Sequence, residues 1–517
     1  MNIGRAFLLL VMTFLTACQT SDSISHRRVF LIVRDSLEIS KAGVSRVTMD
    51  IPRLFSMKIG EKIGLSLKQD EHLTFQIDDI ETVNQYRSWT AHLVKEGHVY
   101  RAVIVQTGEE IVGSIDLPTG AYRISGSTKD IILQDVSGFP ALIFEPNHSD
   151  GMRPSRIPPS PSLSIVTIPD PGPIEVVHIR VLTLITRELA NSFPGGLFKL
   201  KPYLNLLQQK ARQAMKDSRV YIELDFLEAP TVTPIDGIPM GASNLDTLKN
   251  ITPSEGPIEK WSILIRNAKR STNADLVVLF TSFRGGNCGV AWIGGHRDSP
   301  DIPSLDLTNA AQIGYSVVNV NDSNCDQYTL SHEIGHNLGS VHDYVTQSSS
   351  SERGAFNYSF GHRGQRFVTI MGYPDASHTR LGYFSNPDAL SCLGQPCGIM
   401  PGLANAADNF DGFNSVRAKV SQWHYFRDLS IEVQGQGSVV STYLDGQDTG
   451  FQRINCPSNC FTTVPSGRVI RLTAVPDRGF KFLAWRNSKC SNSECDIHNQ
   501  DVPTSSVVAI FAALQRD

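Results

Sequence analysis

The segment from His332 to Asp343 limits what this chain can fold into more than any other stretch of its 517 residues. It reads H-E-x-x-H-x-x-G-x-x-H-D. On a helix, His332 and His336 lie four residues apart, so their imidazoles leave the same face one turn apart. Gly339 can adopt the left-handed conformation that ends a helix, and the chain can then turn back and bring His342 beside the other two. The spacing therefore predicts a helix, a tight turn and three converging histidines.

Three converging histidines predict a zinc site. Zn²⁺ accepts imidazole nitrogens at about 2.0–2.1 Å, and three protein ligands with one open position are typical of catalytic zinc. Glu333 follows the first histidine and is placed to take a proton from a metal-bound water instead of binding the metal. The alternative, a set of polar residues on a solvated helix face, leaves the agreement of six fixed positions with one mechanism unexplained.

The same stretch resembles the signature of the metzincin zinc peptidases, and Asp343 after the third histidine is similar to the reprolysin-like branch. That family has a methionine turn downstream, and the segment 369–373 (Thr-Ile-Met-Gly-Tyr) fits it, 29 residues after His342. The resemblance implies that Met371 forms an apolar base beneath the zinc ligands and that Asp343 anchors this turn by hydrogen bonding. For Tyr373 it leaves two roles open: one at the metal or the oxyanion, and one in packing only.

Two further segments resemble substrate-binding parts of that family. Gly285–Gly294 places glycines around a short β-prone core and is similar to the edge strand along which metzincins lay their substrate antiparallel. Gly289, Val290 and Ala291 are then the expected substrate contacts, although a plain edge hairpin would give the same pattern.

The residues from Gly372 to Phe384 are expected to wall the substrate pocket, because the segment after the methionine does so in this family. Arg380 would then select an acidic side chain. Phe384-Ser385-Asn386-Pro387 resembles a stretch of bacterial reprolysin-like and peptidyl-Asp metallopeptidases, which agrees with that hypothesis.

The N-terminus resembles a bacterial lipoprotein signal. A basic start ending at Arg5 precedes the apolar run Ala6–Ala17, which is too short to span a bilayer comfortably. Small residues precede Cys18, which is therefore expected to carry a lipid and to anchor the chain to a membrane. Gln19 resembles the residue that sorts such proteins to the outer membrane. An ordinary secretory signal with a chance cysteine is the alternative.

Of the nine cysteines, eight remain after Cys18, and an even number in an exported protein indicates disulfides. Spacing favours the pairs Cys392–Cys397, Cys456–Cys460 and Cys490–Cys495, which leaves Cys288–Cys325.

We therefore expect a multidomain chain with a β-rich N-terminal domain, an α/β metzincin catalytic domain built on a twisted mixed sheet, and a small disulfide-stapled all-β C-terminal domain. The expected boundaries are a signal peptide at 1–18, a tether at 19–28, a propeptide-like domain at 29–145, a proline-rich linker at 146–173, the catalytic domain at 174–427 and the C-terminal domain at 428–517.

Hydrophobic periodicity places the elements within these domains. The N-terminal strands are expected at 29–33, 47–51, 72–77, 89–94, 100–106 and 111–115. In the catalytic domain, strands are expected at 176–186, 220–227, 274–281 and 313–320, with the third central, and helices at 201–219, 257–269 and 414–426. The C-terminal strands are expected at 429–442, 467–475, 480–485 and 505–511.

The N-terminal domain resembles a propeptide by its position, with a spacer or adhesion domain as the alternative. No cysteine lies between Cys18 and Cys288, so latency through a propeptide thiolate is excluded, and a carboxylate or steric plugging would be needed. The prolines of 146–173 predict an extended linker that cannot join a sheet. This linker is the expected processing site, and a cut there would release the peptidase from the membrane.

These features predict a zinc metalloendopeptidase acting on proteins or peptides outside the cytoplasm. A zinc amidase acting on cell-wall material and a surface-binding protein with a degenerate peptidase domain are the alternatives. A net charge of −4 without a basic patch gives no reason to expect nucleic acid as a partner. The C-terminal domain is expected to bind a surface or glycan, or only to stabilise the end of the chain.

Overall fold

The structure, a computed structural model, describes the folded parts of the chain. The described residues are 32–33, 43–67, 72–83, 86–136, 151–152, 175–229, 233–238, 243–252, 260–282, 287–294, 313–320, 325–347, 353–375, 377–388, 392–425, 427–444, 453–464, 468–503 and 505–514. The expected lipidation site Cys18 and most of the linker lie outside them. None of the helices in these ranges is long and apolar enough to cross a membrane.

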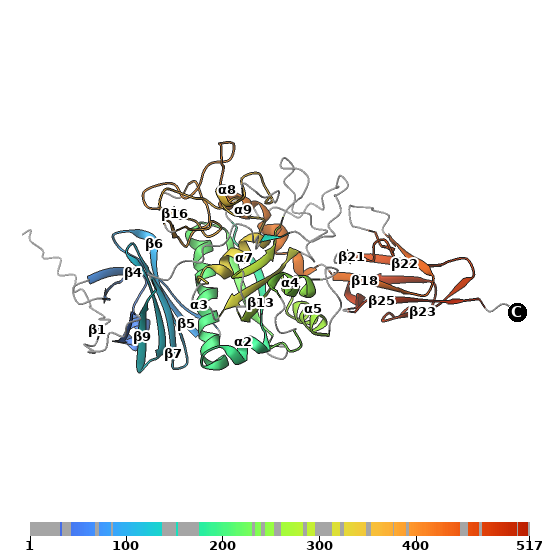
Figure 1. The fold of residues 1–517 in the computed structure, drawn as a ribbon, viewed down its shortest axis with the longest axis horizontal. Coiled ribbons are helices and arrows are strands. Elements are labelled where there is room, and N and C mark those ends of the chain that lie inside the picture. Colours follow the sequence, from blue (N-terminus) through green and yellow to red (C-terminus); the bar gives the residue numbers. More distant parts are fainter. Residues whose placement is uncertain are drawn as a thin grey trace, which may run out of the picture.

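Three β-containing bodies follow one another along the molecule, blue at one end, green to orange in the middle and red at the other (Figure 1). The first is a nine-stranded antiparallel sheet in the order β1-β2-β9-β8-β7-β6-β5-β4-β3. Its strands are β1 (Ile32–Val33), β2 (Val44–Thr48), β3 (Lys62–Ser66), β4 (His72–Val83), β5 (Tyr86–Leu93), β6 (Gly97–Thr107), β7 (Glu110–Leu117), β8 (Gly120–Ser127) and β9 (Asp130–Asp135).

The predicted end of the strand at 47–51 is wrong, because β2 ends at Thr48 and Ile51–Ser56 forms helix α1. The Asp50 side chain accepts a hydrogen bond from the amide of Arg53 at 3.1 Å, and Pro52 lies in the first turn. An aspartate cap followed by proline is a helix-start signal that outweighs the β-prone residues before it.

The central body is a six-stranded mixed sheet in the order β10-β14-β15-β13-β11-β12. Its strands are β10 (Gly151–Met152), β11 (Val177–Ile185), β12 (Ile222–Glu228), β13 (Leu276–Ser282), β14 (Gly289–Trp292) and β15 (Tyr315–Val320). The strands β11, β12, β13 and β15 are parallel, and β14 runs antiparallel to β15. As expected from its continuous apolar run, β13 is central.

Helices cover both faces of this sheet. One core contains residues of α3 (Gly196–Asp217), α7 (Thr329–Asn337) and α9 (Asn409–Val420), and the opposite core contains residues of α4 (Asn244–Ile251) and α5 (Lys260–Thr272). The remaining short elements are α2 (Arg187–Ser192), α8 (Tyr344–Gln347), β16 (Phe367–Val368), β17 (Thr379–Arg380) and the 3₁₀ turn η2 (Trp423–Tyr425).

The closing helix begins five residues earlier than expected, at Asn409, and ends at Val420. Asp408 explains the early start, because its side chain accepts a hydrogen bond from the amide of Asp411 at 3.0 Å. Side-chain capping of this kind sets a helix start where apolar periodicity is weak.

The C-terminal body is built from two four-stranded sheets, β21-β18-β25-β23 and β20-β19-β22-β24, around one apolar core. The strands are β18 (Arg427–Gln434), β19 (Gly437–Tyr443), β20 (Asn455–Cys456), β21 (Phe461–Val464), β22 (Val469–Pro476), β23 (Phe480–Arg486), β24 (Glu494–His498) and β25 (Val507–Ala513), with the 3₁₀ turn η3 (Asn499–Asp501). The strand expected at 429–442 is therefore two strands, separated by a turn at Gly435, whose φ is +93°.

The N-terminal sheet packs against α3 of the central body. Asp217 accepts a hydrogen bond from Nε of Arg101 at 2.6 Å, and Lys210 Nζ lies 3.0 Å from an oxygen of Asp116. Lys216 Nζ lies 2.8 Å from Asp79. Apolar side chains from both bodies pack beside these pairs. The two bodies are thus held by side-chain contacts as well as by the linker.

Candidate active site

The helix expected at the zinc motif is α7, and all nine of its residues are buried. Leu330 and Ile334 project into the core of the central body. After Leu338 the chain turns at Gly339, whose φ is +94°. A methyl group at Gly339 would lie 2.6 Å from Cβ of Ala355, so this turn requires glycine both for its backbone conformation and for space.

The three histidines come together as their spacing predicts. Their ligand atoms all lie within 4.8 Å of one another, and the side chains are buried. His332 Nδ1 lies 2.8 Å from the carbonyl oxygen of Ile370, and His336 Nδ1 lies 2.9 Å from that of Ser340. A carbonyl can only accept, so each Nδ1 carries the proton and each Nε2 keeps a lone pair for a metal.

This arrangement fits a zinc ion. Nε2 of His342 lies 3.1 Å from Nε2 of His336. Two nitrogens bound tetrahedrally at 2.0–2.1 Å from one zinc ion would lie about 3.3 Å apart. Since the family implied by the motif uses zinc, His332, His336 and His342 are the residues that would hold it.

Glu333 lies between this triad and strand β14. Its side chain is 1 % exposed. A methyl group at Gly289 would lie 2.3 Å from Oε1 of Glu333, so the backbone of β14 passes directly beside the carboxylate. The expected proton acceptor and one of the three expected substrate contacts, Gly289, are therefore neighbours.

Met371 is fully buried and packs against α7. A methyl group at Gly335, between the two helical histidines, would lie 2.4 Å from Sδ of Met371. The preceding residue, Ile370, supplies the carbonyl that orients His332. The methionine segment thus supports the histidine pair both by packing and through a backbone hydrogen bond.

Asp343 connects the end of the zinc motif to the methionine segment. It accepts hydrogen bonds from the Tyr373 amide at 3.0 Å, from Nε of Arg363 at 3.0 Å and from the Thr346 hydroxyl at 2.7 Å. Burial alone would raise the pKa of Asp343, but the hydrogen bonds and the charge of Arg363 outweigh it and hold the pKa below its ordinary value. These are the contacts that an anchoring role requires.

The ring of Tyr373 lies against two of the histidines. It is stacked on His332 with ring centres 5.6 Å apart, and its centre lies 4.4 Å from that of His342. The ring therefore packs at the candidate metal site, whether or not its hydroxyl takes part in the reaction.

Arg380 is already engaged by the chain itself. Its Nη1 donates to Asp326 at 2.5 Å, and its Nη2 donates to the carbonyl oxygen of Gly372 at 2.9 Å. An acidic substrate side chain would therefore compete with Asp326 for this guanidinium. Arg380 therefore lies near the methionine turn, but its charge is already paired with Asp326.

The edge position beside β14 is taken by the chain's own linker. Gly151–Met152 pairs with Ala291–Trp292 in the parallel direction. A methyl group at Gly151 would lie 2.7 Å from Cε1 of His336, so this backbone touches a candidate zinc ligand. The expectation that the linker cannot join a sheet is wrong here, because no proline lies between Pro146 and Pro154 and the backbone donors are available.

Comparison with known proteins agrees with this geometry. Residues 255–403, which include the zinc motif and the methionine turn, match the family model described as metallo-peptidase family M12B, reprolysin-like. This part of the chain is thus similar to reprolysin-like metallopeptidases. Residues 32–130 match the model of the BamI lipocalin-like domain, so the N-terminal sheet is lipocalin-like.

Proteins similar to this chain include two named peptidyl-Asp metalloendopeptidase. One, from Pseudomonas aeruginosa, is 30% identical over 177 residues, which cover 31% of this chain and 28% of that protein. The other, from Stenotrophomonas maltophilia, is 27% identical over 318 residues, which cover 59% of this chain and 66% of that protein. The chain thus matches less than two thirds of the length of either relative.

A solved structure of metalloproteinase-II from Bacteroides fragilis aligns with a TM-score of 0.35 and 12% identity, covering 58% of this chain and 88% of that one. A similarity this low does not establish a shared fold.

Four disulfides join the cysteines in the pairs that their spacing favours: Cys288–Cys325, Cys392–Cys397, Cys456–Cys460 and Cys490–Cys495. The first connects the residue before β14 to the segment that leads into α7. It therefore ties the expected substrate strand to the helix that carries His332. Disulfides of this number are typical of proteins outside the cytoplasm.

Three residues of the candidate active site were not predicted. Arg363 binds Asp343 and the carbonyl of Tyr373. The Asn337 amide donates to the carbonyls of Trp292, Ile313 and Tyr315, and so fastens α7 to the sheet. Gly151 lies on His336. Only Asn337 carried a local signal, an amide at the buried end of the zinc helix. The others act through contacts between segments far apart in sequence.

Proposed function

We propose that this protein is a zinc-dependent metalloendopeptidase of the metzincin α/β type that hydrolyses protein or peptide bonds outside the cytoplasm. The observation that supports it best is the convergence of three buried histidines whose two helical members have Nδ1 turned to carbonyls, with the carboxylate of Glu333 beside them. A surface-binding protein would not need a buried carboxylate next to such a triad.

The chemistry divides between the metal and the side chains. Zinc, when bound, polarises the scissile carbonyl and acidifies a water molecule. Glu333 takes a proton from the attacking water and passes it to the leaving amine. Strand β14 offers backbone groups for an extended substrate, with Gly289 leaving room for the carboxylate of Glu333. Asp343 and Arg363 hold the methionine turn in place.

The proposal includes latency by steric plugging. The pairing of Gly151–Met152 with β14 places the linker on the edge that an extended substrate would use. It runs parallel to β14, which is opposite to the expected substrate direction. The N-terminal lipocalin-like domain is then a propeptide domain, and a cut in 146–173 frees the edge.

Two parts of the proposal concern placement and selectivity. Cys18 is the lipidation site that anchors the uncut chain, at the outer membrane or cell surface. Selectivity for an acidic residue would match the peptidyl-Asp activity for which the relatives are named. Arg380 would bind that residue if the substrate displaces Asp326. A peptide library would show this as enrichment of aspartate or glutamate next to the cleaved bond.

The decisive experiment compares the processed protein with its Glu333→Ala variant on casein, on a fluorogenic peptide and on purified cell wall. Activity on casein and peptide that is lost in the variant and with phenanthroline, while the variant still contains zinc, would support the peptidase. Release of material from cell wall without cleavage of protein would instead identify a zinc amidase. Full activity of the variant on protein would refute the role of Glu333.

A further inference from the structure

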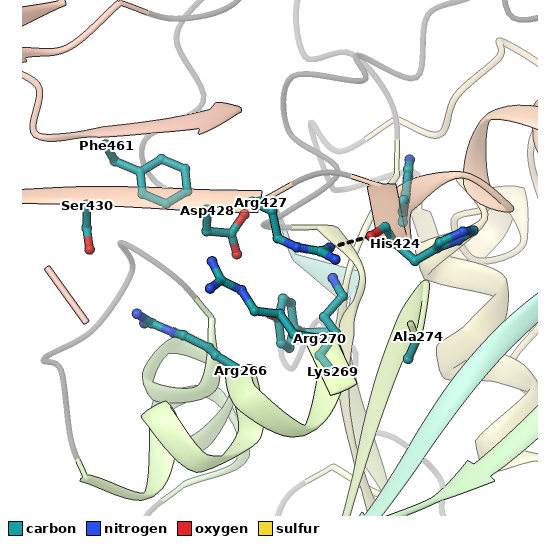
Figure 2. Close-up of a pocket in the computed structure, with 11 residues that line it drawn as sticks. Arg266, Lys269, Arg270, Ala274, His424, Arg427, Asp428, Ser430 and Phe461 are labelled. Atoms are coloured by element: carbon teal, nitrogen blue, oxygen red, sulfur yellow. Dashed lines mark hydrogen bonds between the residues drawn. The ribbon is translucent and has the colours of Figure 1, made fainter. Parts of the chain in front are cut away.

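A basic pocket lies between the metallopeptidase domain and the C-terminal domain, apart from the zinc site (Figure 2). Arg266, Lys269 and Arg270 come from helix α5, and Arg427 and Asp428 from the start of β18. In Figure 2 the side chains of Arg266 and Arg270 extend from α5 toward the strand that carries Asp428. Two domains therefore contribute cations to one small space.

Among the described residues that line this pocket, basic side chains outnumber acidic ones. Asp428 is the only acidic residue among those lining it, against four cations. The nearby Asp275 acts on Lys269 through its charge, but it accepts a hydrogen bond from the backbone amide of His424 at 3.0 Å and pairs with the ring of His424 at 2.7 Å. Within the described part of the chain, no salt bridge joins Arg266, Lys269 or Arg270 to a carboxylate.

Arg266 shows the imbalance most clearly. The residue is 7 % exposed, and its Nε and Nη2 are buried with no hydrogen-bond partner among the described residues. A buried guanidinium without a partner is costly, because it gives up water and gains nothing in return. Burial also lowers the pKa of Lys269 and of Arg270, which means that the surroundings penalise their charged forms.

The dipole of α5 does not account for this cluster. Lys269 and Arg270 lie in the last turn, where cations interact favourably with a helix. Arg266 lies one turn earlier, and Arg427 belongs to the other domain. The last-turn position therefore does not explain the buried guanidinium of Arg266.

We propose that this pocket binds one compact multivalent oxyanion, a phosphate or sulfate group. Guanidinium groups offer paired donors that match such oxygens, and an ammonium adds a point charge. The cavity has a volume of about 20 Å³, more than one water needs, so it suits a single small group rather than an extended ligand. Because Arg270 also donates to the carbonyl of Val502 in the C-terminal domain, the bound anion would join the two domains.

The test uses the full chain and follows thermal unfolding in potassium phosphate, potassium sulfate and potassium chloride at matched ionic strength. We expect the melting temperature to be higher in phosphate and sulfate than in chloride. Arg266→Gln should lose that difference, whereas Arg478→Gln, which removes the same charge from an exposed turn, should keep it. Equal melting temperatures in the three salts, or an undiminished difference in Arg266→Gln, would overturn the proposal.

Two further measurements guard against a folding defect and identify the source of the anion. Lys269→Met removes the ammonium group, whose Nζ lies 4.8 Å from the centre of the Tyr315 ring, and keeps an unbranched side chain. It should weaken phosphate binding in calorimetry at a temperature where the variant is folded. Unchanged binding there would also count against the proposal. A phosphomonoester that stabilises as well as inorganic phosphate would indicate the terminal group of a larger molecule. Stabilisation by the inorganic ions alone would indicate a free ion.

Discussion

Gly289 and Glu333 touch so closely that the smallest side chain, a methyl group at Gly289, would lie 2.3 Å from Oε1 of Glu333. The glycine is on the strand that would hold the substrate, and the glutamate is the proposed proton acceptor. Strand and base are therefore positioned by one contact, and neither can shift without the other.

Gly289→Ala should displace the Glu333 carboxylate and lower kcat of the processed enzyme on the order of 100-fold, the cost typical of a small misplacement of a catalytic group. Zinc content should be unchanged, because no ligand is altered. Steady-state kinetics with metal analysis would check this, and wild-type activity in Gly289→Ala would contradict the described contact.

Gly151→Val should activate the uncut chain. The added side chain would collide with the ring of His336, so the linker should leave the edge of β14. Peptidase activity of a chain kept intact should rise several-fold over the uncut parent, which gel electrophoresis must show to be unprocessed. Gly64→Val, at an open strand position, controls for a general loosening of the N-terminal domain. If uncut Gly151→Val has no more peptidase activity than the uncut parent, this segment does not impose latency.

Tyr373→Phe separates the two roles left open for that residue. Phenylalanine keeps the ring contacts with His332 and His342 and removes only the hydroxyl. If the hydroxyl supports the oxyanion, kcat should fall by about 10²–10³-fold with little change in KM. We expect this loss. A rate near that of the parent enzyme would assign Tyr373 to packing.

Asp408→Asn should stabilise the central body at neutral pH. Burial, helped by the charges of Asp411 and Asp388, raises the pKa of Asp408 to about 6, although the capping hydrogen bond opposes this rise. A raised folded-state pKa means that its contribution to stability is present below the unfolded value of about 3.9 and is lost as pH rises through about 6.

Asparagine caps a helix about as well as aspartate and carries no charge. The variant should therefore unfold at a higher temperature at pH 7, with a flatter dependence between about pH 4 and pH 6. Asp408→Ala, which loses the cap as well, should not show the gain. Both variants can be checked by measuring the temperature at which the central body unfolds, from about pH 4 to pH 7.

The features that were predictable depend on residues close together in sequence. His332, Glu333 and His336 share one helix turn, Gly339 ends it, and three disulfides close loops of four or five residues. Short strand-like patterns also indicated a β-rich N-terminal domain. Its strands β3, β8 and β9 were missed, because short segments with alternating glycine or polar residues carry a weak pattern.

The features that were missed depend on distant segments meeting. Arg363 lies 20 residues from Asp343, and nothing in its own neighbourhood marks it as a partner. Arg380 looked free for a substrate, because its partner Asp326 lies 54 residues earlier. Gly151 pairs with Ala291 of β14, 140 residues later, and the surrounding prolines argued against any strand there.

The side-chain contacts between the N-terminal sheet and α3 have a consequence for activation. Arg101 with Asp217, Lys210 with Asp116 and Lys216 with Asp79 do not depend on the continuity of the linker. Cleavage in 146–173 would break the chain but leave these pairs and the apolar contacts beside them. Under the proposed processing, nicking and shedding would be separate events. The nicked protein would remain a two-fragment complex until those pairs dissociate, and the proposed lipid on Cys18 would hold both fragments at the membrane.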